Sequence, residues 1–299
     1  MKLQDAYYEL RFELAFRAAK GDAFQTFFEK LMGLAYKADF MACRPWGNQG
    51  DKKNDGFLKS QKQLFQCYAP NEMTKAAASK KITEDFGGAK AHWGKHFDRW
   101  TFVHNAIDGL PPHVHEIIMQ FEIDNPGIKL EPWCLEELLP IFRKLSLEDR
   151  QSWFGPVPDE ATKLSLGFED LRIVLETIAT KPVMALSPVK DVPYGKIEAN
   201  ALSESISTLL RAGMSKAPLV GEFFTKWHAA QFGEKIAEAF RAKYRELRGT
   251  MSPNEIFVEI QKWAGGDGRG TAEHELAVLT VIAYYFDSCD IFEEPKDSK

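Results

Sequence analysis

The sequence predicts an α/β N-terminal domain followed by an all-α C-terminal domain. Three observations support this. Short apolar runs bounded by turn residues, typical of strands, occur only before about residue 145. Helical apolar spacing lies between these runs, and after residue 145 it is the only pattern that remains. We therefore predict domains at residues 1–148 and 149–299, the first with an αβββαβ order and a mixed sheet covered by helices on both faces.

The elements of the first domain follow from apolar spacing and turn residues. Helices are expected over 4–19 and 23–37, with Asp22 placed to cap the second. Three strands follow, over 40–46, 56–59 and 63–69, and Pro70 ends the third because proline has no N–H for the ladder. The remaining elements are a helix over 72–86, a strand over 99–104, a helix over 112–123, a strand over 127–132 and a helix over 134–145.

Glycines are expected to stop the helix over 72–86. Gly87 and Gly88 follow it directly, and Gly94 separates His92 from His96. The two histidines have the i,i+4 spacing of a metal pair, but a broken helix would not place them on one face. We therefore interpret them as solvated or core histidines.

The second domain is predicted from long amphipathic patterns. Helices are expected over 168–180, 198–212, 220–227, 231–247, 253–264 and 271–287. The helix over 253–264 has the clearest start, because Ser252 and Glu255 are spaced as a capping box around Pro253. Residues 153–158 and 181–194 are expected to be loops.

Composition limits the possible functions. The net charge is −5, from 38 basic and 43 acidic residues, so any nucleic-acid contact must come from a local patch or a partner. No apolar run reaches membrane-spanning length, and the charged N-terminus does not resemble a secretory signal. The four cysteines are scattered. We expect a cytoplasmic protein with free thiols and no membrane contact.

Residues 50–70 carry the candidate site. Asp55 begins one predicted strand, and Gln66 lies on the next. Tyr68 is two residues further on and shares a face with Gln66. The oxygens of Asp55 and Gln66, the backbone carbonyl of Cys67 and the carboxylate of Glu29 are the kind of ligands that Mg²⁺ (or Mn²⁺) prefers.

This arrangement resembles the PD-(D/E)XK restriction-endonuclease-like superfamily, and within it the Mrr-like nucleases. The match covers about residues 20–140 and rests on Asp55-Gly56 and Gln66-Cys67-Tyr68 in the αβββαβ order. The resemblance implies that Asp55 and Gln66 hold the metal and that Glu29 matches the helix acid. Tyr68 stands at the position of the catalytic lysine, so Lys62 or Lys75 would have to take that role.

A structural interpretation of the same residues remains open. An Asp-Gly pair between strands is often only a turn, and a strand Gln or Tyr often satisfies a local hydrogen bond. Glu29 is then a surface residue on a helix, and Lys62 and Lys75 are solvated.

The second domain resembles the C-terminal domains of ABC-three-component (Lamassu-type) antiphage systems. The resemblance covers about residues 195–295, and its most specific part is the Cys-Asp-Ile-Phe-Glu sequence at 289–293. It implies docking on an ABC/SMC-type ATPase, a small middle subunit or a second copy of this chain, giving a homo-oligomer.

Together, these resemblances imply an antiphage defence effector that cuts DNA when a partner ATPase recruits it. The alternative is a catalytically inactive nuclease-fold scaffold or nucleic-acid-binding subunit of the same complex. A third option is a helical interaction protein with an unrelated mixed-sheet domain.

Overall fold

The computed structural model describes residues 1–43, 53–72, 74–106, 109–179, 195–226, 230–266, 270–288 and 291–293. The chain forms two compact units. One unit, called here the sheet unit, is Arg11–Asp149. The other, the helical unit, combines Met1–Leu10 with Arg150–Lys299. The first helix, α1 (Leu3–Ala18), contributes residues to both.

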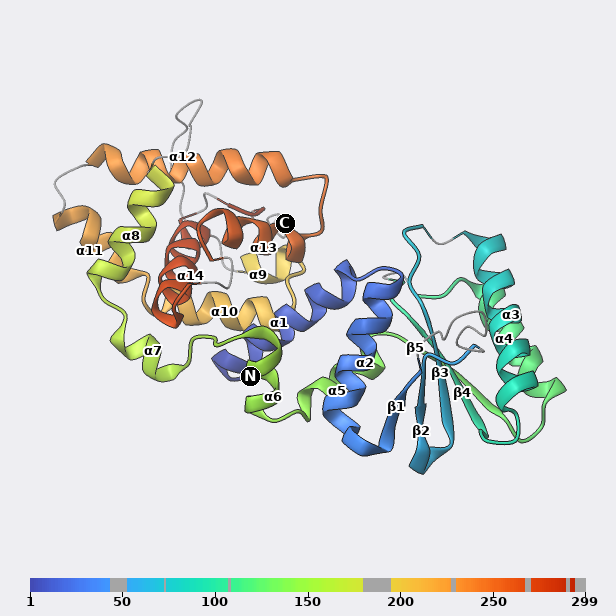
Figure 1. Ribbon diagram of the computed structural model, residues 1–299. Helices are drawn as coiled ribbons and strands as arrows, with labels where there is room; N and C mark the ends of the chain where they lie inside the picture. The colour runs from blue at the N-terminus through green and yellow to red at the C-terminus, as the bar shows by residue number, and fades with distance from the viewer. Residues whose placement is uncertain are drawn as a thin grey trace. The chain divides into compact units, whose positions relative to one another are not determined.

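The sheet unit contains both helices and strands (Figure 1). After α1 its elements are α2 (Asp22–Tyr36), β1 (Phe40–Ala42), β2 (Gly56–Leu58), β3 (Gln63–Tyr68), α3 (Lys75–Trp93), β4 (Arg99–His104), α4 (Pro112–Asp124), β5 (Lys129–Trp133) and α5 (Leu135–Arg143). This order agrees with the expected succession of elements. The part of the first predicted strand beyond residue 43 lies outside the described residues.

The five strands form one mixed sheet in the order β1-β2-β3-β4-β5, which confirms the predicted mixed sheet. The pairs β1–β2 and β2–β3 are antiparallel, whereas β3–β4 and β4–β5 are parallel. In the parallel part Gln66 pairs with Phe102, and Tyr68 pairs with His104. The carboxyl ends of β3 and β4 therefore meet at one edge of the sheet.

Helices cover both faces of the sheet (Figure 1). On one face, Phe28 of α2 packs against Phe65 of β3, with ring centroids 5.1 Å apart. On the other, α3 and α4 pack over Leu64, Trp100 and Phe102. Because side chains alternate along a strand, Gln66 and Tyr68 share the α3 face with Leu64.

The structure corrects two local expectations. Helix α3 does not end at Gly87 and Gly88 but continues to Trp93, because buried side chains such as Ile82, Phe86 and Ala89 hold it on the sheet. That packing outweighs the cost of about 1 kcal/mol that each helical glycine carries. The N-cap of α2 is Gly21 rather than Asp22, which instead lies in the first turn, near the positive end of the helix dipole.

The helical unit contains helices of very different lengths (Figure 1). They are α6 (Leu147–Phe154, which starts in the sheet unit), α7 (Glu160–Ser165), α8 (Phe168–Ala179), α9 (Lys196–Ala199), α10 (Glu204–Met214), α11 (Pro218–Lys226), α12 (Ala230–Leu247), α13 (Pro253–Trp263) and α14 (Ala272–Asp287). Its described residues hold no strand apart from one isolated bridge between Arg248 and Met251. The prediction of an all-helical second part is therefore confirmed.

Helix α14 forms the centre of this unit, with eleven buried residues. Helix α10 packs closely on it at Gly213, where a Cβ would lie 2.7 Å from the Cβ of Ala283 and 2.8 Å from the carbonyl oxygen of Leu279. No larger residue fits at this crossing without moving a helix. Among the described helices, none is long and apolar enough to cross a bilayer.

Helix boundaries in this unit agree with expectation at one place and differ at two. The capping box of α13 is confirmed: the Ser252 N–H donates to Glu255 Oε2 over 2.8 Å. Helix α10 begins at Glu204, after its cap Ser203, rather than at residue 198. The expected loop at 153–158 starts later, because Trp153 and Phe154 complete α6.

Candidate functional site

The structure brings Asp55 and Gln66 together at one end of the β2–β3 hairpin. The Asp55 N–H donates to the Phe65 carbonyl over 2.9 Å, and Asp55 Oδ2 accepts the Cys67 N–H over 2.6 Å. The β3 partners in these two hydrogen bonds, Phe65 and Cys67, are the residues directly before and after Gln66. Asp55 and Gln66 are each only 3% exposed, so a carboxylate and an amide are buried side by side.

Gln66 carries an uncompensated polar atom. Its Oε1 is buried and has no hydrogen-bond partner among the described residues. Leaving such an acceptor unpaired costs about 1–3 kcal/mol, so the group is suited to a ligand that would satisfy it. A divalent cation such as Mg²⁺ prefers oxygen ligands and commonly uses one or two carboxylates with water and substrate oxygens. The pair fits that ion, although the described residues contain no group of three His, Cys, Asp or Glu with metal-binding geometry.

Glu29 and Cys67 lie within electrostatic reach of the same end of β3. Burial, and then the negative charges of Asp55 and Glu29, raise the pKa of the Cys67 thiol well above its usual value, while Lys81 partly offsets them. The sulfur is therefore a neutral thiol rather than a reactive thiolate. Glu29 Oε1 accepts a hydrogen bond of 3.0 Å from Gln25 on the preceding turn of α2.

The two lysines named from the sequence lie elsewhere. Lys62 occupies the turn before β3 with a left-handed φ of 45° and forms an exposed ion pair with Asp98 over 3.8 Å. Four residues of strand, roughly 13 Å, separate its backbone from Gln66. Lys75 is exposed at the start of α3.

Two other lysines approach the site instead. Asp85 of α3 is fully buried, and its carboxylate lies 2.9 Å from the Nζ atoms of both Lys53 and Lys81. The stem of Lys53 crosses α3 at Gly88, where an added Cβ would lie 2.6 Å from Lys53 Cγ. We refer to Lys53, Lys81 and Asp85 as the lysine clamp.

The lysine clamp could be predicted only in part. Lys81 and Asp85 have the i,i+4 spacing of a helical ion pair, and Asp85 falls on the apolar face between Ile82 and Phe86. A carboxylate at such a position signals a buried charge that needs a partner. Nothing in the sequence near Lys53 indicates that it reaches α3.

Tyr68 and His104 complete the carboxyl ends of β3 and β4. Burial, and then the charge of Asp85, raise the pKa of Tyr68, so its phenol is neutral, and its ring lies 5.7 Å from that of Phe102. Burial and the nearby His115 lower the pKa of His104 to about 4. His104 Nδ1 accepts the Ala106 N–H over 3.2 Å, which leaves Nε2 as the protonated nitrogen at neutral pH. Both residues are thus neutral hydrogen-bond donors at an edge where α/β sheets commonly bind ligands.

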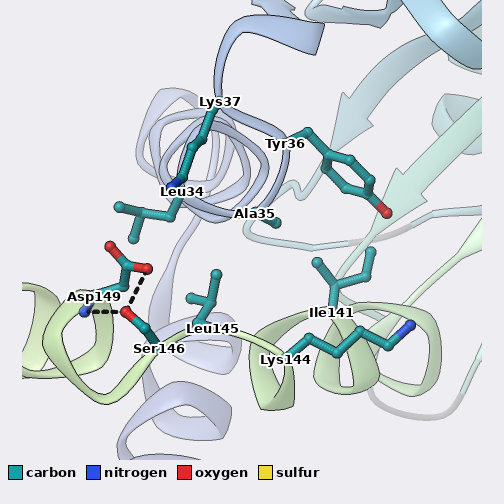
Figure 2. Close-up of a pocket in the computed structure, with 9 residues that line it drawn as sticks. All are labelled: Leu34, Ala35, Tyr36, Lys37, Ile141, Lys144, Leu145, Ser146 and Asp149. Carbon is teal, nitrogen blue, oxygen red and sulfur yellow. Dashed lines mark hydrogen bonds between the residues drawn. The ribbon is translucent and has the colours of Figure 1, made fainter.

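A cavity of about 380 Å³ lies away from this site, at the carboxyl ends of α2 and α5 (Figure 2). Lys37 and Lys144 follow those helix ends, where cations offset the partial negative charge of the dipole. Ser146 Oγ donates to Asp149 Oδ2 over 2.7 Å and accepts the Asp149 N–H over 3.0 Å, the pattern of a helix cap. The cavity holds none of the residues predicted from the sequence.

Glu293, the last residue that the structure describes, is held by a polar clasp. Asn200 Nδ2 donates to the Glu293 carbonyl over 2.7 Å, and the Glu293 N–H donates to Asn200 Oδ1 over 2.9 Å. Tyr244 donates its hydroxyl proton to Glu293 Oε1 over 2.9 Å. Cys289 and Asp290, from the predicted Cys-Asp-Ile-Phe-Glu motif, lie outside the described residues.

Comparison with known proteins gives a similarity in this part of the chain. No match was found among curated proteins or among solved structures. Residues 169–293, from the first turn of α8 to the clasped Glu293, match the family model of C-terminal domain 10 of the ABC-three component (ABC-3C) systems. This match supports the resemblance expected for the second part of the chain: residues 169–293 are similar to a C-terminal domain of the ABC-3C systems.

Proposed function

We propose that this chain is the effector of an ABC-3C antiphage system and that its sheet unit is a metal-dependent DNA endonuclease of the PD-(D/E)XK type. The domain match at residues 169–293 supports the assignment to a multi-component defence system. The observation that carries the nuclease proposal is the pairing of Asp55 with Gln66, whose buried Oε1 has no described partner, beside the lysine clamp. The antiparallel β1–β2–β3 hairpins followed by the parallel β4 also fit the core of that superfamily.

Asp55 and Gln66 would hold Mg²⁺ or Mn²⁺, with the Glu29 carboxylate and the Cys67 carbonyl as further candidate ligands. A bound divalent cation supplies Lewis-acid polarisation of a phosphodiester and a more acidic water. The hydrogen bond from the Cys67 N–H fixes Asp55 Oδ2, so the carboxylate is oriented before any ligand arrives.

Lys81 would take the place of the lysine that the motif lacks. Its ammonium group is close enough to lower the pKa of Cys67, which lies between Gln66 and Tyr68. Asp85 orients Lys81 through contacts of 2.9 and 3.0 Å. A cation fixed in this way can stabilise negative charge that develops on a phosphate, which the neutral phenol of Tyr68 cannot do.

The proposed partners are DNA, an ABC/SMC-type ATPase, a small middle subunit and a second copy of this chain. The overall charge of −5 gives little general attraction for DNA. Recruitment by a partner would therefore control when the sheet unit meets its substrate.

Plasmid nicking by the complex with its ATPase tests the nuclease proposal. With Mg²⁺ or Mn²⁺ the native protein should nick supercoiled DNA, and Asp55→Asn should abolish nicking. Lys81→Met should lower the rate roughly 10²- to 10³-fold, as expected for loss of one preorganised charge. Lys62→Met is the matched control. Lys62 lies in the β2–β3 turn, at the end of β3 that is remote from Gln66, so this variant should keep the native rate.

The outcomes separate the candidates. An equal loss in Lys62→Met and Lys81→Met would contradict the role given to Lys81. The absence of nicking by the native complex with either metal would favour the second candidate, an inactive nuclease-fold scaffold or nucleic-acid-binding subunit. One observation favours that candidate: both lysines of the clamp already contact Asp85.

A further inference from the structure

A second hollow lies on the α3 side of the sheet, at the edge formed by β1 and β2. It has a volume of about 230 Å³, and its lining is almost entirely apolar. The residues used below are Met41, Asn54, Phe57, Lys59, Trp93 and His96. We refer to this hollow as the edge pocket.

Three ring side chains line the edge pocket. Phe57 comes from β2, Trp93 ends α3, and His96 follows three residues later. The Trp93 and His96 rings meet edge to face, with centroids 6.4 Å apart and an angle of 68°. Met41, opposite Phe57 on β1, is 50% exposed and leaves the outer side open. Such a hollow fits one flat aromatic ring.

Asn54 adds a polar group to this apolar lining. Its side chain is 3% exposed, and its Oδ1 is buried with no hydrogen-bond partner among the described residues. An unpaired buried amide is costly, so a ligand that offers an N–H at the edge of its ring would be favoured over a hydrocarbon ring. A nucleobase has such an edge, whereas a phenyl ring does not.

A cation lies at the rim. Lys59 follows β2 directly, is exposed and makes no ion pair with the residues that the structure describes. An ammonium group beside an aromatic pocket suits a ring that carries a phosphate.

Three successive residues link the edge pocket to the candidate site along the chain. Lys53 contacts Asp85, Asn54 lines the edge pocket and Asp55 accepts the Cys67 N–H. A phosphate bound at Asp55 would therefore lie one residue along the chain from Asn54, within reach of a neighbouring base in the pocket.

We propose that the edge pocket binds one unstacked nucleobase of the nucleic acid that the sheet unit acts on. The base stacks among Phe57, Trp93 and His96, its polar edge faces Asn54, and Lys59 contacts the attached phosphate. This inference rests on the proposed function for its nucleic-acid partner, but it assigns binding residues that cleavage chemistry does not need.

Calorimetric titration of the full-length protein with mononucleotides tests the edge pocket. In EDTA, dAMP should bind, and deoxyribose 5-phosphate, which lacks the base, should bind at least tenfold more weakly. Trp93→Leu should weaken dAMP binding roughly 5- to 150-fold, the range expected for one stacking contact. The control is His92→Ala, an exposed residue directly before Trp93 that does not line the pocket; it should leave dAMP binding unchanged.

His96→Ala keeps the test valid if Trp93→Leu fails to fold. His96 is exposed, so its removal should leave folding intact and weaken dAMP binding several-fold. Equal binding of dAMP and deoxyribose 5-phosphate would overturn the inference, and so would native dAMP affinity in the folded His96→Ala and Trp93→Leu variants.

The result is independent of the cleavage assay, because dAMP has no phosphodiester bond and EDTA removes the metal. Binding of dAMP by a complex that never nicks DNA would contradict the nuclease proposal alone. Nicking by a protein that does not distinguish dAMP from deoxyribose 5-phosphate would contradict the edge pocket alone.

Discussion

Each compact unit buries a carboxylate between two cations, but the two arrangements differ. In the helical unit, fully buried Glu238 accepts hydrogen bonds from Arg241 over 2.8 Å and from Arg245 over 2.6 Å, all on α12. In the sheet unit, fully buried Asp85 meets Lys81 on its own helix and Lys53 from the segment before β2. One arrangement is local to a helix, and the other joins distant parts of the chain.

The two arrangements use different cations, arginine in the helical unit and lysine in the sheet unit, and these differ in how they bind a carboxylate. Burial alone would raise the pKa of Glu238, but the bonds from Arg241 and Arg245 outweigh it and hold the pKa below its ordinary value. Arginine stays charged and binds carboxylates through a rigid fork, which suits a permanent structural contact. Lysine is a mobile point charge that can shift between a carboxylate and a bound phosphate. The arginine pair therefore suits a fixed structural contact, whereas the lysine clamp suits the ligand role proposed above.

The largest effect expected from this comparison is on stability. Arg241→Met leaves Glu238 buried with one remaining partner and should lower the free energy of unfolding by about 3 kcal/mol. Lys53→Met should cost only about 1 kcal/mol, because Lys53 is 37% exposed and Asp85 keeps Lys81. Urea unfolding of both variants measures the difference, and equal losses would remove the distinction between the two arrangements.

A second prediction concerns acid, because the sheet unit also buries a histidine that has no carboxylate partner among the described residues. The pKa of His104 is lowered from 6.5 to about 4, so the unfolded chain binds the proton first as the pH falls. The neutral ring therefore contributes fully to the free energy of unfolding above pH 6.5. This contribution, on the order of 3 kcal/mol, is lost as the pH falls to 4.

His104→Asn should flatten this pH dependence, because its amide oxygen can accept the Ala106 N–H without titrating. The exposed His92→Gln is the control and should keep the native profile. Thermal unfolding between pH 4 and 7 provides the measurement. A native slope in His104→Asn would show that another group causes the acid loss.

The smallest expected effect is on the stability of α3, and it tests where the Lys53 side chain lies. Gly87→Ala meets no atom within 4 Å and should stabilise α3 by up to about 1 kcal/mol. Gly88→Ala should lose that gain, since its Cβ would lie 2.6 Å from Lys53 Cγ. Comparison of the two melting temperatures tests this, and an equal rise would mean that Lys53 does not lie across α3 in solution.

Much of the fold could be predicted from the sequence because its signals are local. Apolar alternation and turn residues located all five strands, and helical spacing located the long helices. The errors came where tertiary packing outweighs local preference. Gly87 and Gly88 remain helical because Ile82 and Phe86 are buried on the sheet. Asp22 lies in the first turn of α2 rather than at its cap.

The candidate site was less predictable, because it depends on contacts between distant residues. The neighbouring positions of Asp55 and Gln66 follow from one hairpin, and the structure brings them together. The sequence favours Lys62 as the catalytic lysine because it is close to Gln66 along the chain. In the structure, β3 runs away from the turn that holds Lys62, so this lysine lies at the opposite end of β3 from Gln66. Lys53 reaches Asp85 only because β2 and α3 pack in the folded sheet unit.

The shared helix α1 has a consequence for separating the sheet unit from the rest of the chain. Its first residues belong to the helical unit, where Tyr8 donates to the Gly155 carbonyl over 3.1 Å and Asp5 pairs with Arg150 over 2.9 Å. Its later residues belong to the sheet unit, where Phe12 stacks on Phe142 with ring centroids 4.3 Å apart. In genetic terms the sheet unit is an insertion into the helical unit rather than a fusion to its end. Exchanging the sheet unit for another domain therefore requires two junctions, one within α1 and one within α6.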